Sequence, residues 1–252
     1  MKFCLISSGS KGNCTYVQSK EAKILIDFGI SKKRVLDAIK AYGVTSLDAI
    51  DNLLITHNHS DHIANIRYIP KDKWMIEFDN TKEELFDKQY ITPLMPFKIK
   101  DMLITPLPLS HDSPSCVGFL IEADGERLCQ ITDTGYVPQK VLNLIKDCEY
   151  YVFESNHDTK MLYTSSRPIA LIKRIHSDHG HMDNTSASYY LSNIIGSKTK
   201  EVYLAHLSEE CNTPELAVST FKKIYQEQTG NTINFYLACG SVTTPLYGGK
   251  DA

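Results

Sequence analysis

The stretch THNHSDH, residues 56–62, places three histidines and an aspartate within seven positions, and neither a helix nor a strand needs that composition to fold. Histidine is only marginally favoured in a protein core, and three imidazoles so close together are costly to bury without partners. Imidazole and carboxylate groups are, however, common ligands of zinc, manganese and iron. The stretch therefore predicts a metal-binding loop. The alternative is a solvated polar loop in which Ser60 or Asp61 caps a following helix.

Three further ligand-type residues follow predicted strands in the same way. They are His111 after ITPLPLS, Asp133 after LCQIT and His206 after EVYLA. In α/β proteins the loops beyond strand ends carry the chemistry while the strands hold those loops in place, so we expect these residues to converge. The full set of candidate metal ligands is His57, His59, Asp61, His62, His111, Asp133 and His206. A set of that size suits two divalent ions better than one.

Strand patterns alternate with helical patterns along the whole chain. Strands are predicted at 2–7, 14–19, 23–29, 52–57, 149–155, 201–206 and 232–238, with a hairpin at 116–133. Helices are predicted at 31–43, 137–147, 184–196 and 213–230, and Thr81 and Glu84 stand at capping-box spacing for a short helix at 81–88. No long linker or low-complexity segment interrupts this alternation, which predicts one α/β domain over residues 1–252.

The composition of the chain is that of a globular protein, with 42% hydrophobic and 23% charged residues among 252. No run of about 18 apolar residues occurs, so we expect no membrane partner. The N-terminal MKFCLISSGSKGN has too short an apolar run for a signal peptide, which favours a cytoplasmic protein. The seven cysteines stand singly, without a C-x-x-C pair, which predicts buried apolar thiols in a reducing compartment.

The charge balance limits the ways in which this chain can attract a polyanion. Lys and Arg total 27 against 30 for Asp and Glu, which gives a net charge of −3. Any contact with nucleic acid must therefore come from a local basic patch. Arg167, Lys173 and Arg174 form one such feature, which either receives phosphates or is a plain solvated helix face.

The pattern H-x-H-x-D-H, followed by a distant His, Asp and His in that order, resembles the metallo-β-lactamase superfamily over nearly the whole chain. The resemblance implies a four-layer αββα sandwich that holds two divalent ions, zinc or manganese, with a bridging hydroxide as nucleophile. In that arrangement His57, His59 and His111 hold one ion, Asp61, His62 and His206 hold the other, and Asp133 bridges them. Asp27 matches the superfamily's early aspartate, which braces the histidine loop.

Two further motifs indicate phosphodiester chemistry. Glu154 in VFESNHD and His181 in SDHGHMDN resemble the Glu and His that nucleic-acid-processing members of the superfamily hold together as an acid pair. In that role Glu154 orients His181, which protonates the departing oxygen. Asp61 is the third predicted catalytic residue, in addition to its role as a ligand. The alternative is that Glu154 caps the SNHD turn and His181 is a surface residue.

A narrower resemblance rests on six motifs in order: SSGSKGN, LSHD, TDTGYV, FESNHD, SDHGHMDN and YLAHLSEECNTPELA. Together they are similar to the YycJ, or WalJ, family of bacterial metallo-β-lactamase-fold proteins, which implies a 5′-to-3′ DNA exonuclease. The substrate is then a nucleic acid or nucleotide phosphodiester. Phage phosphodiesterases that hydrolyse cyclic mononucleotides to defeat Pycsar immunity share some of these motifs, and they define the main alternative.

Other readings of the chain stay open at this point. A thioester or lactam hydrolase uses the metals without His181, and a binding module uses them without turnover. The SSGSKGN loop either cradles an anion or is a tight turn between two strands. His157, His176 and His179 have no assigned role, and assembly as a homodimer is compatible with the resemblance.

Overall fold

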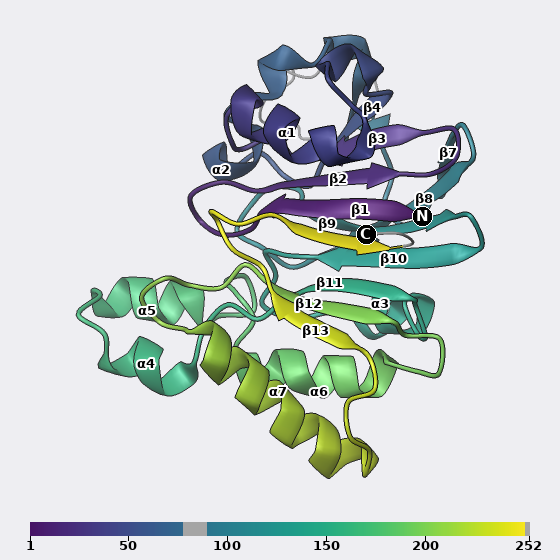
Figure 1. Cartoon of the computed structure of the whole chain (residues 1–252). Coiled ribbons are helices and arrows are strands. Elements are labelled where there is room, and N and C mark those ends of the chain that lie inside the picture. Colours follow the sequence, from purple (N-terminus) through teal and green to yellow (C-terminus); the bar gives the residue numbers. More distant parts are fainter. Residues whose placement is uncertain (78–89, 250–252) are drawn as a thin grey trace. The chain divides into compact units, whose positions relative to one another are not determined.

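The computed structural model describes residues 1–77 and 90–249 (Figure 1). The chain divides into two compact units. Unit 1 comprises Met1–Leu107, Ser113–Glu126 and Ser241–Ala252, and unit 2 comprises Pro108–Asp112 and Arg127–Gly240. The short helix predicted at 81–88 lies outside the described residues. The single domain predicted over residues 1–252 stays a prediction.

Unit 1 contains a seven-stranded mixed sheet in the order β14-β1-β2-β3-β4-β5-β6. The first four strands in that order pair antiparallel, and β3 to β6 pair parallel. The strand bounds are β1 (Lys2–Ser7), β2 (Cys14–Gln18), β3 (Lys23–Ile26), β4 (Asn52–Ile55), β5 (Trp74–Glu77), β6 (Tyr90–Ile91) and β14 (Leu246–Gly249). Strands β7 (Phe97–Ile99), β8 (Met102–Pro108) and β9 (Val117–Ala123) follow, and β7 and β8 pair antiparallel.

The helices of unit 1 are short, and α1 packs on the sheet. Helix α1 (Lys32–Ile39) begins at Ser31, whose side chain accepts a hydrogen bond from the Arg34 amide, as its sequence predicts. The 3₁₀ turn after it ends at Gly43, which takes the left-handed conformation with φ of 75°. Buried apolar residues of α1 and of β1 to β5 form the core of this unit. Within residues 1–77, the remaining elements are α2 (Ser60–Ile63) and four 3₁₀ turns, η1 (Lys40–Tyr42), η2 (Leu47–Ala49), η3 (Ile66–Tyr68) and η4 (Lys71–Lys73).

Unit 2 contains four parallel strands in the order β13-β12-β11-β10. Their bounds are β10 (Glu126–Ile131), β11 (Tyr150–Glu154), β12 (Glu201–Ala205) and β13 (Tyr236–Cys239). The helices are α3 (Gln139–Leu144), α4 (Thr159–Thr164), α5 (Ile169–Ile175), α6 (Asn184–Ile194) and α7 (Pro214–Thr229). Helices α6 and α7 pack together beside β11 to β13, and α4 and α5 form a separate pair (Figure 1).

The predicted strand at 232–238 begins later than its sequence pattern indicates. Strand β13 starts at Tyr236, because that residue pairs with Glu201, the first residue of its partner strand β12. The Phe235 ring before it packs against Phe221 and Tyr225 of α7. The bounds of most of the other predicted helices and strands match those of the structure within a few residues. All seven cysteines are free thiols, and only Cys239 is not fully buried, which agrees with their predicted role as small apolar residues. Among the described residues, no helix has both the length and the apolar character needed to cross a bilayer.

The histidine loop of unit 1, residues 56–62, is anchored by backbone hydrogen bonds to the segment after β3 and to the residue before β2. The Phe28 amide donates to the His62 carbonyl at 2.7 Å, and the Asn13 amide donates to the Asp61 carbonyl at 2.8 Å. Gly29 lies so close to Asp61 that a Cβ atom at position 29 would stand 1.6 Å from the Asp61 carbonyl oxygen. Any side chain there must displace the loop that carries the candidate ligands.

We predict that Gly29→Ala lowers the free energy of unfolding by about 3 kcal/mol, because overpacking displaces backbone as well as side chains. Gly43→Ala is the matched control, since a Cβ at position 43 meets no atom within 4 Å and only the left-handed φ opposes it. That change should cost about 1 kcal/mol. Urea unfolding of both variants measures the difference, and equal losses would contradict the close-approach argument.

Candidate metal centre and acid pair

The histidine loop follows β4 and enters the single turn of α2. The Nδ1 atom of His62 lies 2.8 Å from Oδ2 of Asp27, and both side chains are buried. A carboxylate accepts the Nδ1 proton, so the His62 Nε2 atom keeps its lone pair, which is the form that binds a metal. Asp27 also accepts hydrogen bonds from the amide and the hydroxyl of Thr56. Asp27 therefore holds the base of the loop and one of its imidazoles together.

The structure gathers three imidazole rings of this loop. The His57 ring centroid is 4.6 Å from that of His59 and 4.1 Å from that of His62. Residue His59 is itself the N-cap of α2, without a side-chain capping bond, and Ser60 and Asp61 lie inside the helix. The alternative in which Ser60 or Asp61 caps a following helix is therefore wrong.

Asn13 is a site residue that the sequence analysis did not identify. Its Nδ2 atom lies 2.9 Å from Nε2 of His62 and 3.3 Å from Oδ2 of Asp61. The Asn13 Oδ1 atom accepts from the Gly9 amide at 2.9 Å, which closes the SSGSKGN loop on itself as a turn between β1 and β2. A glycine-rich loop with one asparagine directly before a predicted strand is the sequence signal that points to it.

Unit 2 carries the other predicted ligands at strand ends: His111 after β8, Asp133 after β10 and His206 after β12. All three side chains are buried. Asp133 and His206 have φ values of 61° and 55°, in the left-handed region that costs non-glycine residues about 1 kcal/mol or more. The surrounding structure must hold these two residues in place against that cost.

The unit 2 residues fit a divalent metal by the spacing of their donor atoms. Oδ1 of Asp133 lies 3.4 Å from Nε2 of His206, which is about the separation of two ligands that each stand about 2.1 Å from a tetrahedral ion. Ligand atoms of His111, Asp133 and His181 also lie within 4.8 Å of one another. Burial lowers the pKa of His111, against the opposing effect of Asp133, and so favours the neutral imidazole that metals bind. The predicted dinuclear centre combines ligands from both units, and it stays a prediction.

Glu154 and His181 form a close pair inside unit 2. Oε1 of Glu154 lies 2.7 Å from Nδ1 of His181 and 3.4 Å from Nδ1 of His206, and its Oε2 accepts from the Thr134 amide at 2.8 Å. Burial acts to raise the pKa of Glu154, but the charge and hydrogen bonds of His181 and His206 outweigh it and lower that pKa. Glu154 is therefore a fully buried carboxylate engaged by His181 and Thr134, and it does not serve as the cap of the SNHD turn.

The loop that carries His181 is packed tightly against the end of α5. A Cβ atom at Gly180 would stand 2.2 Å from the carbonyl oxygens of Arg174 and Ile175, so only glycine fits without a shift. The Gly180 carbonyl accepts from Nδ1 of His111 at 3.1 Å, which directs the His111 Nε2 atom away from that bond. The same loop therefore positions a candidate ligand and the candidate acid.

The unassigned histidines lie around this centre in unit 2. The Nε2 atom of the buried His157 lies 3.3 Å from Nδ1 of the exposed His176. The Nδ1 atom of His157 lies 3.3 Å from Oδ1 of Asn156. The side-chain Nδ2 atom of Asn156 in turn donates to the His206 carbonyl at 2.7 Å. His179 is exposed and its Nδ1 lies 3.0 Å from Oγ of Ser110. His157 thus supports His206 through Asn156.

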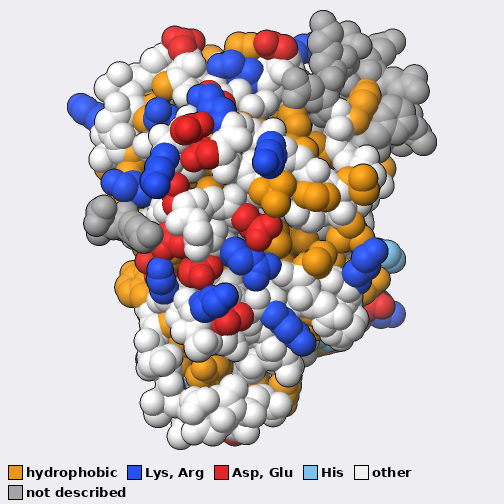
Figure 2. Space-filling model, turned by 90° about the vertical axis from the view of Figure 1, so that its right-hand side faces the viewer, with side chains coloured by type: hydrophobic (Ala, Val, Ile, Leu, Met, Phe, Trp, Pro, Cys, Tyr) orange, Lys and Arg blue, Asp and Glu red, His pale blue; other side chains and the backbone are white. Residues whose placement is uncertain are grey.

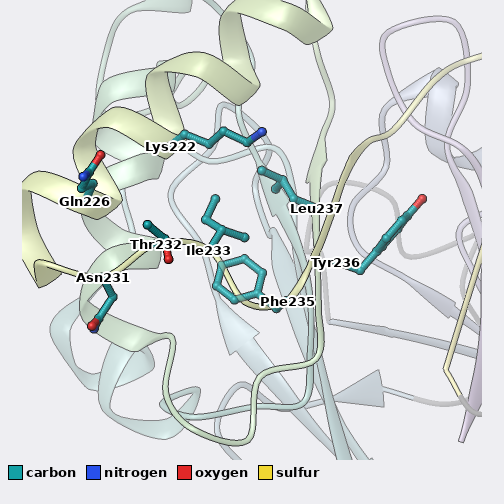
Figure 3. Close-up of a pocket in the computed structure, with 8 residues that line it drawn as sticks. All are labelled: Lys222, Gln226, Asn231, Thr232, Ile233, Phe235, Tyr236 and Leu237. Carbon is teal, nitrogen blue, oxygen red and sulfur yellow. The ribbon is translucent and has the colours of Figure 1, made fainter.

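A cavity of unit 2 lies beside α7 and the segment before β13 (Figure 3). Its centre is lined by Ile233 and Phe235, while Tyr236 points away from them. The eight lining residues include no His, Cys, Asp or Glu, so this cavity offers no ligand for a metal and no acid or base of that kind. The polar chemistry of the unit is at the strand ends instead.

Comparisons with known proteins place the chain in a family. Residues 22–207 match the model of the β-lactamase superfamily domain. The chain belongs to the β-lactamase superfamily, with the YycJ and WalJ proteins. It is 32% identical over 90% of both chains to exodeoxyribonuclease YycJ of Bacillus anthracis, and 29% identical over 97% of both to exodeoxyribonuclease WalJ of Streptococcus pneumoniae.

A solved structure shares the fold of this chain. The metallo-β-lactamase fold protein YhfI of Bacillus subtilis superposes with a TM-score of 0.68 at 17% identity, covering 98% of this chain and 99% of that one. The superfamily match and this similarity confirm the predicted metallo-β-lactamase fold class. The protein is a metal-dependent hydrolase of that fold, and its His and Asp clusters suit divalent ions.

We predict that His157 makes the stability of the protein depend on pH. Burial lowers its pKa from 6.5 to about 4, so between those values the folded chain binds fewer protons at His157 than the unfolded chain does. Stability is therefore lost as the pH falls from about 6.5 to 4, by up to about 3 kcal/mol. In His157→Gln that part of the pH dependence should vanish.

Urea unfolding between pH 7.5 and 4 measures this loss in the wild type and in His157→Gln. The exposed His179→Gln variant is the control and should keep the wild-type slope. Parallel stability curves for the wild type and His157→Gln would show that the buried imidazole does not set the acid limit.

Proposed function

We propose that this protein is a divalent-metal phosphodiesterase that degrades DNA in the 5′-to-3′ direction. The observation that carries the proposal is the pair of Glu154 and His181, whose Oε1 and Nδ1 atoms are 2.7 Å apart beside Asp133 and His206. A hydrolase of thioesters has no need of such a pair, because a thiolate departs without a proton. The departure of a sugar oxygen does need it, because an alkoxide is a poor leaving group.

The proposed metal ligands are His57, His59, Asp61, His62, His111, Asp133 and His206, which would hold two ions with Asp133 shared between them. When bound, such ions lower the pKa of water and neutralise charge that develops on a phosphate. The Asp27 carboxylate fixes His62 and the Gly180 carbonyl fixes His111, each through Nδ1, so these rings present Nε2. Asp61 combines a ligand role with a role in the chemistry.

His181 would act as the general acid. Its Nδ1 atom is engaged by Glu154, so the proton passes from Nε2 to the departing sugar oxygen. That P–O bond breaks as a new bond from phosphorus to the oxygen of water forms. The ionised state of Glu154 stabilises the imidazolium before the transfer. The side chain of His181 is 21% exposed, which leaves it within reach of a substrate.

The two relatives named exodeoxyribonucleases support DNA as the substrate. The overall charge of the chain does not support DNA as the substrate, because the net charge is −3. On the face shown in Figure 2, positive and negative side chains are interspersed. Small cyclic mononucleotides need less electrostatic attraction than a DNA strand does. They are therefore the second substrate class to test.

We predict cleavage of 5′-end-labelled duplex DNA with release of labelled mononucleotides or short products, and slower turnover of cyclic mononucleotides. Both substrates are incubated with purified protein in Mn²⁺ and, in parallel, Zn²⁺. An Asp133→Asn preparation controls for contaminating nuclease. Turnover of cyclic mononucleotides with intact DNA would reject the DNA proposal and favour the second class.

We predict that His181→Ala slows DNA hydrolysis by about 10² to 10⁴, the usual contribution of a general acid. Hydrolysis of bis(4-nitrophenyl) phosphate should change little, because its leaving group departs without a proton. Glu154→Gln should show the same selective loss. His179→Ala, two residues from His181 in the same loop, is the matched control and should keep both activities.

The metal content of each variant separates the acid role from a ligand role. His181→Ala should retain the wild-type metal stoichiometry. Equal losses on the two substrates, or loss of metal, would falsify the acid assignment.

A further inference from the structure

Arg174 stands in the last turn of α5, next to the proposed acid. It lines one small cavity together with His111, Asp112, Gly180 and His181. The Arg174 carbonyl oxygen lies against Gly180, so the residue is fixed to the loop that carries His181. A cation is thus built into the wall of the cavity that the candidate acid faces.

The guanidinium of Arg174 contacts Asp112. Its Nε atom donates to Oδ2 of Asp112 at 2.5 Å, and Nη2 makes a second, shorter contact with the same oxygen. Oδ1 of Asp112 lies 3.2 Å from Nε2 of His111. The arginine is therefore held in one orientation by a carboxylate that also contacts the candidate ligand His111.

The contact with Asp112 engages only some of the N–H donors of the Arg174 guanidinium. A guanidinium has five N–H donors in a planar fork, which matches a phosphate as well as a carboxylate. The Arg174 side chain remains 58% exposed while it contacts Asp112. It can therefore accept a second anion without leaving the first.

The surrounding segment has the charge that a polyanion requires. Residues 159–177 contain four basic residues, Lys160, Arg167, Lys173 and Arg174, between Asp158 and Asp178, and Arg167 pairs with Glu210. The chain as a whole has a net charge of −3, so this segment is a local exception. A solvated helix face would explain scattered lysines, but it does not explain an arginine held at the cavity of the acid.

We propose that Arg174 is a substrate-positioning residue that binds the phosphate adjacent to the one being cleaved, and so selects a nucleic-acid strand over a mononucleotide. The inference rests on the proposed function, because it takes the cavity at His181 as the place of the reaction. Asp112 keeps the guanidinium oriented when no strand is bound. A substrate with a single phosphodiester has no group for Arg174 to bind.

Steady-state kinetics of Arg174→Gln test the proposal with two substrates. We expect KM for a DNA oligonucleotide to rise about tenfold with little change in kcat, as the loss of one charge-assisted phosphate contact predicts. Turnover of bis(4-nitrophenyl) phosphate should stay at the wild-type level. Lys173→Gln removes the same charge from the neighbouring residue, which does not line the cavity, so its KM for DNA should rise far less than that of Arg174→Gln. Arg174→Lys should restore part of the affinity.

Salt dependence gives a readout that a merely structural role would not change. The slope of log KM against log salt should fall by about 0.7 to 0.9 in Arg174→Gln, for one lost phosphate contact. Equal losses on both substrates, or an unchanged KM for DNA, would overturn the proposal. If the wild type cleaves no DNA, the proposed function is rejected, and the role of Arg174 is tested by fluorescence anisotropy with a labelled oligonucleotide. Equal binding by the wild type and by Arg174→Gln would then reject the phosphate-binding role of Arg174.

Discussion

The chemistry of unit 2 depends on one buried carboxylate. Glu154 has no exposed surface, and an ionised group in that position is stable only when it is paired and hydrogen-bonded. His181, His206 and the Thr134 amide provide those partners. Because they come from the loops after β10 and β12 and from the loop between α5 and α6, satisfying one charge also assembles the site. The lowered pKa of Glu154 is the electrostatic result of the same contacts.

Unit 1 uses the same physical arrangement for a different purpose. Asp27 is buried after β3, and its carboxylate accepts from Nδ1 of His62 and from Thr56. In each unit a carboxylate at a strand end accepts a hydrogen bond from Nδ1 of an imidazole, so that Nε2 is the nitrogen that can act. At His62 that nitrogen suits a metal ion, whereas at His181 it suits proton transfer to a leaving group. The environment of each ring, and not its residue type, separates the two roles.

Tight backbone contacts keep these groups in place. Asp27, Asp133 and His206 all have positive φ values, which unconstrained residues of these types seldom adopt. Gly29 and Gly180 allow the histidine loop and the acid loop to approach neighbouring carbonyl oxygens more closely than any side chain permits. The Gly180 contact also brings Arg174 to the acid, so the substrate-positioning role proposed for that arginine follows from the packing of the loop. The mild negative charge of the chain then matters less than the basic segment around α5.

Short-range patterns in the sequence determined the alternation of strands and helices, the family and the candidate ligands. Hydrophobic periodicity and capping residues act within a few positions, as at Ser31 and Gly43, and H-x-H-x-D-H has a density of ligands that folding does not require. Only the tertiary structure decided where β13 begins, because its first residue, Tyr236, pairs with Glu201 at the start of β12, far away in the sequence. The same holds for the contacts of Asn13 with His62 and of Arg174 with Asp112, which join residues 49 and 62 positions apart. Side chains that meet across such separations follow no local period, so the folded chain alone determines which of them touch.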